Sequence, residues 1–185
     1  MVPELGLTGR PIREFPEPQP LTHHGPARII AMCNQKGGVG KTTTAVNLAY
    51  FLAKDKKNTL LVDFDPQGNA TSGLGINKMP FETAYENSEI SSTMSEVLLG
   101  QKEINEIILN TKFKNLDLAP VTPQLANAEV KLTELDKKFV QLRNAIKKVR
   151  DQYDYIIIDS PPSLSLLTVN GMIASDYLLL PVQTE

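Results

Sequence analysis

Short apolar runs recur from residue 28 onward, separated by longer stretches in which apolar residues are more widely spaced. Each run is four to six residues long, and several are rich in β-branched side chains. Such runs are typical of strands buried on both faces, as in a parallel sheet. The five predicted strands cover residues 29–33, 59–62, 116–119, 155–158 and 177–182.

Two of the intervening stretches, residues 42–54 and 136–152, show helical spacing. In the second, Phe139, Leu142, Ile146 and Val149 recur at intervals of three, four and three residues, which places them on one face of a helix. Strands that alternate with helices predict an α/β fold, in which helices cover both faces of a mostly parallel sheet and the crossovers are right-handed. Residues 77–92 are polar and weakly periodic, so we expect a surface excursion there.

The first 26 residues differ in composition. They hold six of the 13 prolines and few aliphatic side chains. Proline cannot donate to a helix or a sheet ladder, and it biases the preceding residue toward extended conformations. We therefore expect residues 1–26 to form a disordered tail in which His23 and His24 are solvated, and residues 27–185 to form one domain.

Composition and charge fit a soluble globular protein, with 41% hydrophobic and 22% charged residues. The formal net charge is −2, so attraction to nucleic acid or to an anionic membrane requires a local patch. No apolar run approaches the roughly 20 residues that span a bilayer, and the N-terminus lacks a signal-peptide pattern. We expect a cytoplasmic location and no membrane partner. Cys33 is the single cysteine, which excludes an internal disulfide.

Residues 34–43 carry the strongest chemical signal. They read Asn-Gln-Lys-Gly-Gly-Val-Gly-Lys-Thr-Thr and join the first predicted strand to the first predicted helix. A glycine-rich turn in this position lets backbone N–H groups surround a phosphate, and the helix adds its positive N-terminal end. Lys41 is then expected at the β- and γ-phosphates, with the Thr42 hydroxyl on Mg²⁺. The predicted phosphate-binding residues are Lys36, Gly37, Gly38, Val39, Gly40, Lys41, Thr42 and Thr43.

The standard phosphate-loop pattern has a glycine where this chain has Gln35. With Lys36 beside two glycines, the loop instead resembles that of the deviant Walker A ATPases, which include ParA/Soj, MinD and the nitrogenase iron protein. The resemblance implies a P-loop NTPase that binds Mg-ATP and forms an ATP-dependent homodimer. In that dimer Lys36 crosses to the partner's ATP and stabilises charge on the transferred phosphoryl group. The alternative is an exposed loop lysine that contacts no nucleotide.

Two acidic motifs follow later strands. Asp63 and Asp65 come directly after residues 59–62, and Asp159 ends the run 155–158. Ligands of open α/β sheets bind beyond the carboxyl ends of the strands, so we expect Asp63 and Asp65 to face the phosphate loop. Asp159 is predicted to hold Mg²⁺, directly or through water. A plain turn is the alternative interpretation of the first motif.

Residues 63–75 are similar to the switch region of ParA/Soj proteins, and the Ser-Pro-Pro-Ser after Asp159 resembles the second switch of that family. By this resemblance Asp65 positions or activates the attacking water, and Asp63 supports Mg²⁺ or the lysine network. Residues 69–75 favour a partition protein over a MinD-type protein, and one cysteine does not fit the cluster of the iron protein.

The resemblance implies an ATPase that drives chromosome or plasmid segregation, with a ParB-like centromere-binding partner, non-specific DNA as a ligand, and association with the nucleoid. A MinD-like or polar-localisation ATPase remains an alternative, as does an ATP-gated scaffold with incidental turnover.

A basic stretch supplies the local case for DNA contact. Between positions 131 and 150 the chain holds seven basic residues and only two acidic ones. The basic residues are Lys131, Lys137, Lys138, Arg143, Lys147, Lys148 and Arg150. Such a stripe can hold DNA phosphates, although a solvated helix face is the alternative. In the family, the main DNA-contacting residues lie beyond the point that corresponds to residue 185. We therefore expect a domain that is incomplete at its C-terminus, with a non-functional fragment as a further alternative.

Overall fold

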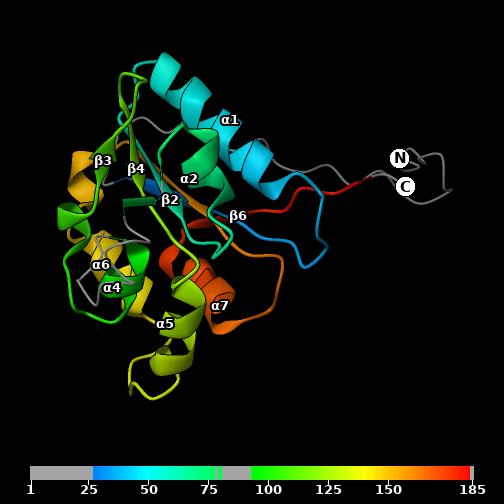
Figure 1. The fold of residues 1–185 in the computed structure, drawn as a ribbon. Coiled ribbons are helices and arrows are strands. Elements are labelled where there is room, and N and C mark those ends of the chain that lie inside the picture. Colours follow the sequence, from blue (N-terminus) through cyan, green and yellow to red (C-terminus); the bar gives the residue numbers. More distant parts are fainter. Residues whose placement is uncertain (1–26, 78, 81–92, 184–185) are drawn as a thin grey trace, which may run out of the picture.

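The computed structural model describes residues 27–77, 79–80 and 93–183. The predicted tail at residues 1–26 and most of the predicted excursion at residues 77–92 lie outside the described residues. Within the described part, six strands form one sheet (Figure 1). They are β1 (Arg28–Met32), β2 (Thr59–Asp63), β3 (Leu109–Asn110), β4 (Leu116–Ala119), β5 (Tyr155–Asp159) and β6 (Tyr177–Leu179).

The strand order is β3-β4-β2-β5-β1-β6, and every neighbouring pair is parallel except β3 and β4. The prediction of a mostly parallel α/β sheet is confirmed. Strand β3 is not among the predicted strands, because its two residues are too few to form an alternating pattern. It pairs with β4 through a hairpin at one edge of the sheet.

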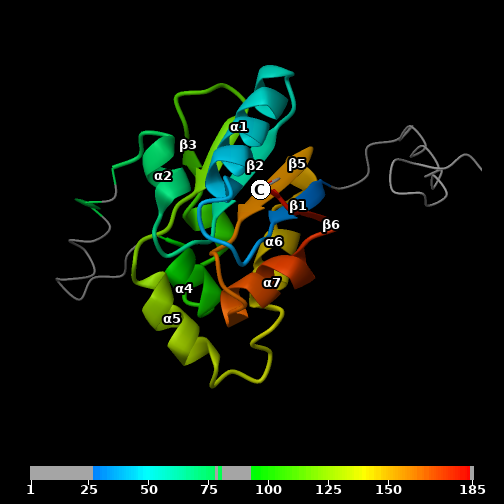
Figure 2. The same ribbon diagram turned by 90° about the vertical axis from the view of Figure 1, so that its right-hand side faces the viewer.

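Helices cover both faces of the sheet (Figures 1 and 2). Helices α1 (Lys41–Lys54) and α2 (Asn69–Gly73) lie on one face. The other face carries α4 (Met94–Leu98), α5 (Leu125–Leu132), α6 (Gln141–Lys147) and α7 (Leu166–Ala174). Successive residues of β2 divide between the layers, because Leu60 and Val62 pack with α4–α7 while Leu61 packs with α1 and α2.

Two short 3₁₀ segments, Ile104–Glu106 and Arg150–Gln152, complete the described elements. None of the helices in the described ranges has the length and apolar character needed to cross a lipid bilayer.

The helix predicted at residues 136–152 is shorter than expected. Helix α6 covers only Gln141–Lys147, and residues 136–140 form turns. The buried side chain of Asn170 on α7 explains the boundary. Its Oδ1 accepts a hydrogen bond from the backbone N–H of Leu142 at 3.3 Å, and its Nδ2 donates to the carbonyl oxygen of Lys138 at 2.7 Å. An amide that is distant in sequence therefore caps the helix, as a local Asn or Ser normally would.

The last predicted strand, residues 177–182, is also shorter in the structure. Strand β6 ends at Leu179 and lies at the sheet edge beside β1. Pro181 follows, and proline has no N–H for a ladder hydrogen bond. The chain continues across the phosphate loop instead, where the carbonyl oxygen of Pro181 accepts a hydrogen bond from Asn34 Nδ2 at 2.7 Å.

Candidate nucleotide-binding site

The predicted site residues lie at the carboxyl ends of three neighbouring strands, at one end of the sheet. Strands β1, β5 and β2 are adjacent and parallel, and their last residues are in register: Met32 pairs with Asp159, which pairs with Asp63. The loops that follow therefore start side by side. This placement brings the phosphate loop, the Asp65 loop and the loop after Asp159 together, at the edge where ligands of parallel α/β sheets bind.

Glycine shapes the phosphate loop where the backbone must adopt positive φ. Gly38 has φ 75° and Gly40 has φ 87°, conformations that side chains disfavour. Gly40 is the N-cap of α1, it makes no side-chain capping hydrogen bond, and the first turn of the helix contains no acid. The first N–H groups of α1 thus lack a side-chain acceptor and face the loop, as an anion site requires.

The two lysines of the loop differ in their surroundings. Lys41 is buried at 7% exposure, and its Nζ donates to the carbonyl oxygen of Lys36 at 3.2 Å. A backbone carbonyl is a weak partner for a buried ammonium compared with a phosphate oxygen. Lys36 itself is exposed on the loop, and its backbone N–H donates to Asn34 Oδ1 at 2.9 Å. The structure therefore places Lys41 inside the site and Lys36 on its outer surface.

Asp159 is a fully buried carboxylate, and neither of its oxygens accepts a hydrogen bond from another described residue within normal bonding distance. The pKa of Asp159 is raised to about 7, mainly by burial; the adjacent Thr42 hydroxyl opposes this shift, the Asp63 and Asp65 carboxylates add to it, and Lys41 opposes it. A buried acid without a partner beside two more carboxylates is unfavourable unless a cation joins them. The Thr42 hydroxyl and the Asp159 carboxylate fit a Mg²⁺ site, because this ion takes oxygen ligands and retains several waters.

Within the described ranges, no group of three or more His, Cys, Asp or Glu side chains is arranged to hold a metal ion unaided. The protein ligands here are few, as in sites where phosphate oxygens and water complete the coordination.

Asp63 has a different environment from Asp159, although both are fully buried. Its Oδ2 accepts hydrogen bonds from both the N–H and the Oγ1 of Thr71, each at 2.7 Å, and its Oδ1 lies 3.4 Å from the N–H of Asp65. The pKa of Asp63 is raised to about 6, because the effect of burial exceeds the opposing effect of the Thr71 hydrogen bonds. These contacts brace the loop that carries Asp65. The metal-supporting role predicted for Asp63 remains a prediction.

Asp65 is nearly buried at 6% exposure and begins a tight turn. Its Oδ1 accepts a hydrogen bond from the N–H of Gln67 at 3.0 Å, and its carbonyl oxygen accepts one from Gly68 at 2.8 Å. The Asp65 carboxylate is close enough to Asp63 and Asp159 to raise the pKa of both. The three acids predicted for the site, Asp63, Asp65 and Asp159, are thus brought together.

Sequence reasoning misses two residues that hold these loops in place. Thr71 joins the Asp65 loop to the end of β4, because its Oγ1 also accepts a hydrogen bond from the N–H of Val121 at 3.3 Å. Gly171, in the middle of α7, lets that helix approach the residue after Asp159: a Cβ added there would lie 2.9 Å from Ser160 Oγ. A glycine inside a helix pattern is the one local signal that could have indicated such a close approach.

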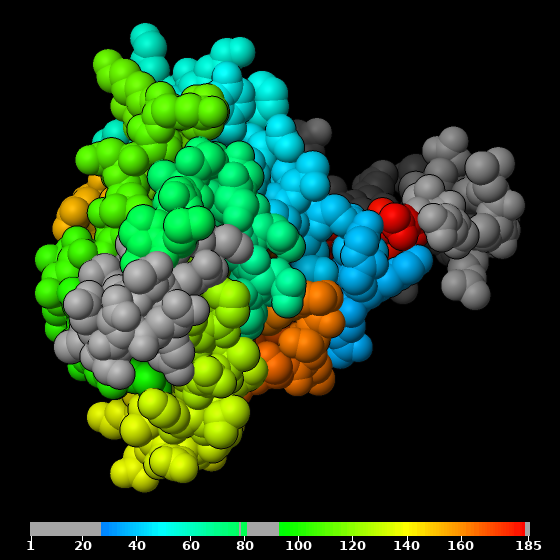
Figure 3. Space-filling model, in the orientation of Figure 1, coloured from blue at the N-terminus to red at the C-terminus, as the bar shows by residue number. Residues whose placement is uncertain are grey.

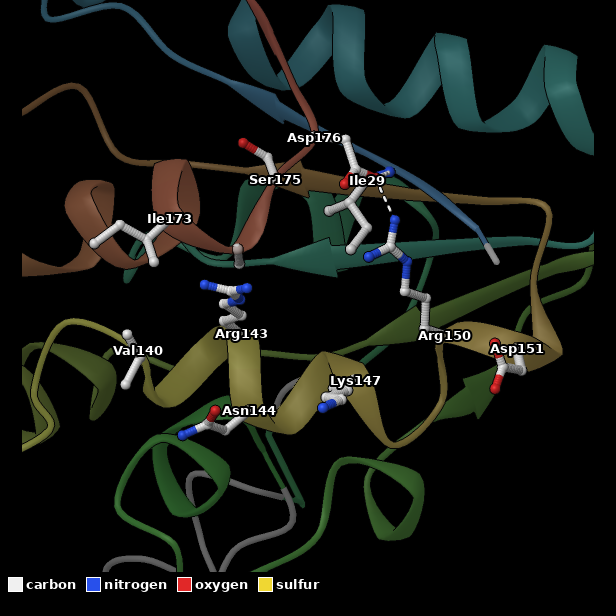
Figure 4. A pocket seen from close by; sticks show the side chains of 11 residues that line it. Ile29, Val140, Arg143, Asn144, Lys147, Arg150, Asp151, Ile173, Ser175 and Asp176 are labelled. Atoms are coloured by element: carbon white, nitrogen blue, oxygen red, sulfur yellow. Dashed lines mark hydrogen bonds and ion pairs between the residues drawn. The ribbon is translucent and has the colours of Figure 1, made fainter. Parts of the chain in front are cut away.

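The basic stretch at residues 131–150 does not form one continuous stripe. Lys148 is paired with Glu103, and Arg150 is paired with Asp176 at 2.7 Å. Figure 4 shows Arg143 pointing from α6 toward the end of α7, where a cavity of about 720 Å³ separates the two helices. The floor of this cavity includes the buried Ile29. The cations are thus spread over several turns and a hollow, and contact of this stretch with DNA phosphates remains a prediction.

Comparison with known proteins adds independent information. A family model described as an AAA domain matches residues 27–185. The chain is 49% identical over 158 residues to the chromosome partitioning protein ParA of Myxococcus xanthus, an alignment that covers 85% of this chain and 53% of that protein. The same identity over 158 residues is found with the sporulation initiation inhibitor protein Soj of Bacillus subtilis, with 85% and 59% covered.

Among solved structures, cobyrinic acid a,c-diamide synthase from Mycobacterium smegmatis with a bound ATP analogue and magnesium is similar, with a TM-score of 0.78 at 36% identity. That match covers 86% of this chain and 61% of the synthase. The chain spans about half the length of the curated relatives it matches.

Proposed function

Because the chain belongs to the AAA-domain family and is of the ParA/Soj type, we propose that it binds Mg-ATP, dimerises with ATP bound and hydrolyses ATP to drive DNA segregation. The buried, unpaired carboxylate of Asp159 beside the phosphate loop is the observation that carries this proposal. The 49% identity to the chromosome partitioning protein ParA of Myxococcus xanthus exceeds the 36% identity to the synthase, which favours partitioning as the process served.

The phosphate loop supplies the binding energy for the nucleotide. Lys41 exchanges the carbonyl oxygen of Lys36 for β- and γ-phosphate oxygens, which are stronger acceptors for its ammonium group. The uncapped N-terminus of α1 donates backbone N–H groups to the same phosphates. Gly38 and Gly40 keep the backbone in the positive-φ turn that directs those groups inward.

Four side chains of the site have separate roles in hydrolysis. Thr42 and Asp159 would hold Mg²⁺, and the ion would supply positive charge beside the phosphates. Asp65 orients the attacking water and accepts its hydrogen bond. Asp63 keeps the Asp65 loop in place through Thr71.

Lys36 acts across a homodimer. Its exposed position on the loop suits contact with the nucleotide of a second copy, where its ammonium stabilises charge on the transferred phosphoryl group. The further partners are a ParB-like centromere-binding protein and non-specific DNA, and the site of action is the nucleoid within the cytoplasm.

Binding of a fluorescent ATP analogue with Mg²⁺ tests the site. Lys41→Ala should abolish binding, because the phosphate charge then lacks its buried cation. Lys131→Ala, an exposed lysine on α5, is the matched control and should bind as wild type does. Affinity of Lys41→Ala within about threefold of wild type would contradict the assignment.

The dimer role of Lys36 needs a separate experiment. Lys36→Gln should bind the nucleotide with wild-type affinity and yet fail to dimerise with a non-hydrolysable analogue, because its proposed contact is made only across the interface. Analytical ultracentrifugation with ADP and with the analogue measures this. Normal dimerisation by Lys36→Gln would show that Lys36 is an ordinary loop residue.

A further inference from the structure

A cluster of lysines lies at the end of α1 that is remote from the phosphate loop. The C-terminus of α1 and the β3–β4 hairpin meet there, and their side chains enclose a hollow of about 380 Å³. In Figure 3, this is where the cyan end of α1 and the green tip of the hairpin touch. We call it the lysine hollow, and the residues that matter are Tyr50, Lys54, Lys56, Lys112, Phe113 and Lys114.

The hollow is strongly positive in a chain whose net charge is −2. None of its four lysines forms an ion pair within the described residues. The nearest acid along the chain is Asp55, the exposed C-cap of α1. A concentration of unpaired like charges opposes folding through self-repulsion, so this arrangement is unexpected if its role is only structural.

The floor of the hollow is apolar and rigid. The rings of Tyr50 on α1 and Phe113 on the hairpin pack edge to face, with centroids 5.1 Å apart. Asn115 Nδ2 also donates to the carbonyl oxygen of Ala53 at 3.3 Å, which ties the hairpin to the helix end. Phe51 stands beside the hollow with 58% of its surface exposed. The hollow is therefore lined by four lysines and an aromatic floor.

Lys56 occupies a position where glycine is normally favoured. The N–H of Lys57 donates to the carbonyl oxygen of Leu52, and that of Lys56 to Ala53, which is a Schellman motif at the end of α1. Lys56 accordingly has φ 62°, in the left-handed region. A lysine there costs about 1 kcal/mol relative to glycine. The lysine at this position therefore has a conformational cost, and it adds a positive charge to the hollow.

We infer that the lysine hollow binds an acidic segment of a partner protein, with one apolar side chain of that segment seated on the Tyr50–Phe113 floor. Carboxylates along the segment pair with the four lysines, and the apolar anchor displaces water from the floor. A duplex nucleic acid offers phosphates but no apolar group to seat in the hollow. Charge complementarity together with the apolar floor therefore favours a peptide.

The position of the hollow leaves the nucleotide site open. Helix α1 has 14 residues, so its two ends are roughly 20 Å apart. The hollow also lies beside β3 and β4, at the opposite sheet edge from β6. A partner bound there needs neither an altered phosphate loop nor any change at the β6 edge.

Fluorescence anisotropy with synthetic probes tests the inference. The probes are a short peptide rich in Asp and Glu with one central Phe, the same peptide with Ala in place of Phe, and a short DNA duplex. We expect the Phe peptide to bind saturably at low salt and the Ala peptide to bind about tenfold more weakly. Equal affinity of the two peptides would show that no apolar side chain is seated on the Tyr50–Phe113 floor. DNA that displaces the Phe peptide and binds more tightly would overturn the choice of partner.

Protein variants locate the site. Lys112→Glu/Lys114→Glu should weaken the Phe peptide by about tenfold or more, whereas Lys131→Glu/Lys137→Glu, with the same change in net charge, should weaken it by less than about threefold. Equal losses would show that only the overall charge matters and would overturn the site.

Lys56→Gly distinguishes the effect of Lys56 on peptide binding from its effect on stability. Glycine relieves the left-handed backbone, so this variant should melt at a higher temperature than wild type and still bind the peptide more weakly. Unchanged peptide affinity in Lys56→Gly would remove Lys56 from the site. The phosphate loop is intact in all these variants, so ATP binding is measured independently of the hollow.

Discussion

Both oxygens of the Asp63 carboxylate are directed at the loop that carries Asp65, and Thr71 makes the two shortest contacts. At the scale of single residues, buried polar groups of this kind are strongly constrained, because each unpaired donor or acceptor costs about 1–3 kcal/mol. Asp159, at the matching position of the neighbouring strand, has no such partner. Two acids in register thus have different surroundings: Asp63 is hydrogen-bonded within the protein, and Asp159 is the proposed magnesium ligand.

Thr71→Val tests the bracing role. The change preserves shape but removes the hydroxyl, leaving one oxygen of Asp63 short of a donor and the N–H of Val121 without an acceptor. We expect a loss of about 1–3 kcal/mol in the free energy of unfolding, slower ATP turnover, and ATP affinity close to that of wild type. Denaturant unfolding and phosphate release measure these effects. Thr71→Ser keeps the hydroxyl and should restore both the stability and the ATP turnover. If Thr71→Val behaves like Thr71→Ser, Thr71 does not brace the loop.

At the scale of elements, α7 fixes the loop after Asp159 through close packing. Gly171→Ala should gain up to about 1 kcal/mol from helix propensity, but it places a Cβ 2.9 Å from Ser160 Oγ, and overpacking of this kind costs about 1–3 kcal/mol. We expect the clash to dominate and the single variant to be destabilised.

The double variant Gly171→Ala/Ser160→Ala removes the clashing oxygen and should be at least as stable as Ser160→Ala alone. Thermal unfolding of the four proteins in this cycle gives the coupling between the two positions. Additive effects would mean that Ser160 is not the residue that requires glycine.

Some elements can be predicted from a local sequence pattern, whereas others depend on residues that are distant in the chain. Strands β1, β2, β4 and β5 are predicted within one residue at each end, because apolar runs buried on both faces leave a local pattern. The phosphate loop is equally local, since its glycines and lysines are contiguous. The start of α6 depends on Asn170, which lies 28 residues beyond Leu142, so no local pattern marks it. The link from Thr71 to Val121 spans 50 residues and is hidden for the same reason.

At the scale of the whole molecule, the buried acids make stability depend on pH. Burial holds the pKa of Asp159 at about 7 and that of Asp63 at about 6, above the ordinary value of 3.8. The folded chain therefore binds more protons than the unfolded chain between about pH 4 and pH 7. Its stability should fall as pH rises through this window, by at most about 1.4 kcal/mol per pH unit for each group, and should then level off.

Asp159→Asn is the control for this pH dependence, because the amide is neutral at every pH. Melting temperatures of wild type and variant should diverge as the pH rises toward neutrality, with the variant more stable. Mg²⁺ with ATP should stabilise wild type more near neutral pH than under acidic conditions, since the cation favours the ionised carboxylate. Parallel melting curves for the two proteins would refute the assignment of the raised pKa to Asp159.

The register of β2 against β5 has a consequence for which length changes the chain tolerates. Asp63 and Asp159 are paired at the ends of neighbouring strands, each directly before a loop of the site. Deleting one residue from either strand would shift its carboxylate by about 3.3 Å and turn it to the opposite face of the sheet. These two strands therefore have a fixed length, set by the site and not only by the core. Insertions and deletions should therefore be rare within β2 and β5 of natural relatives, because a change of one residue in either strand misplaces a carboxylate of the site.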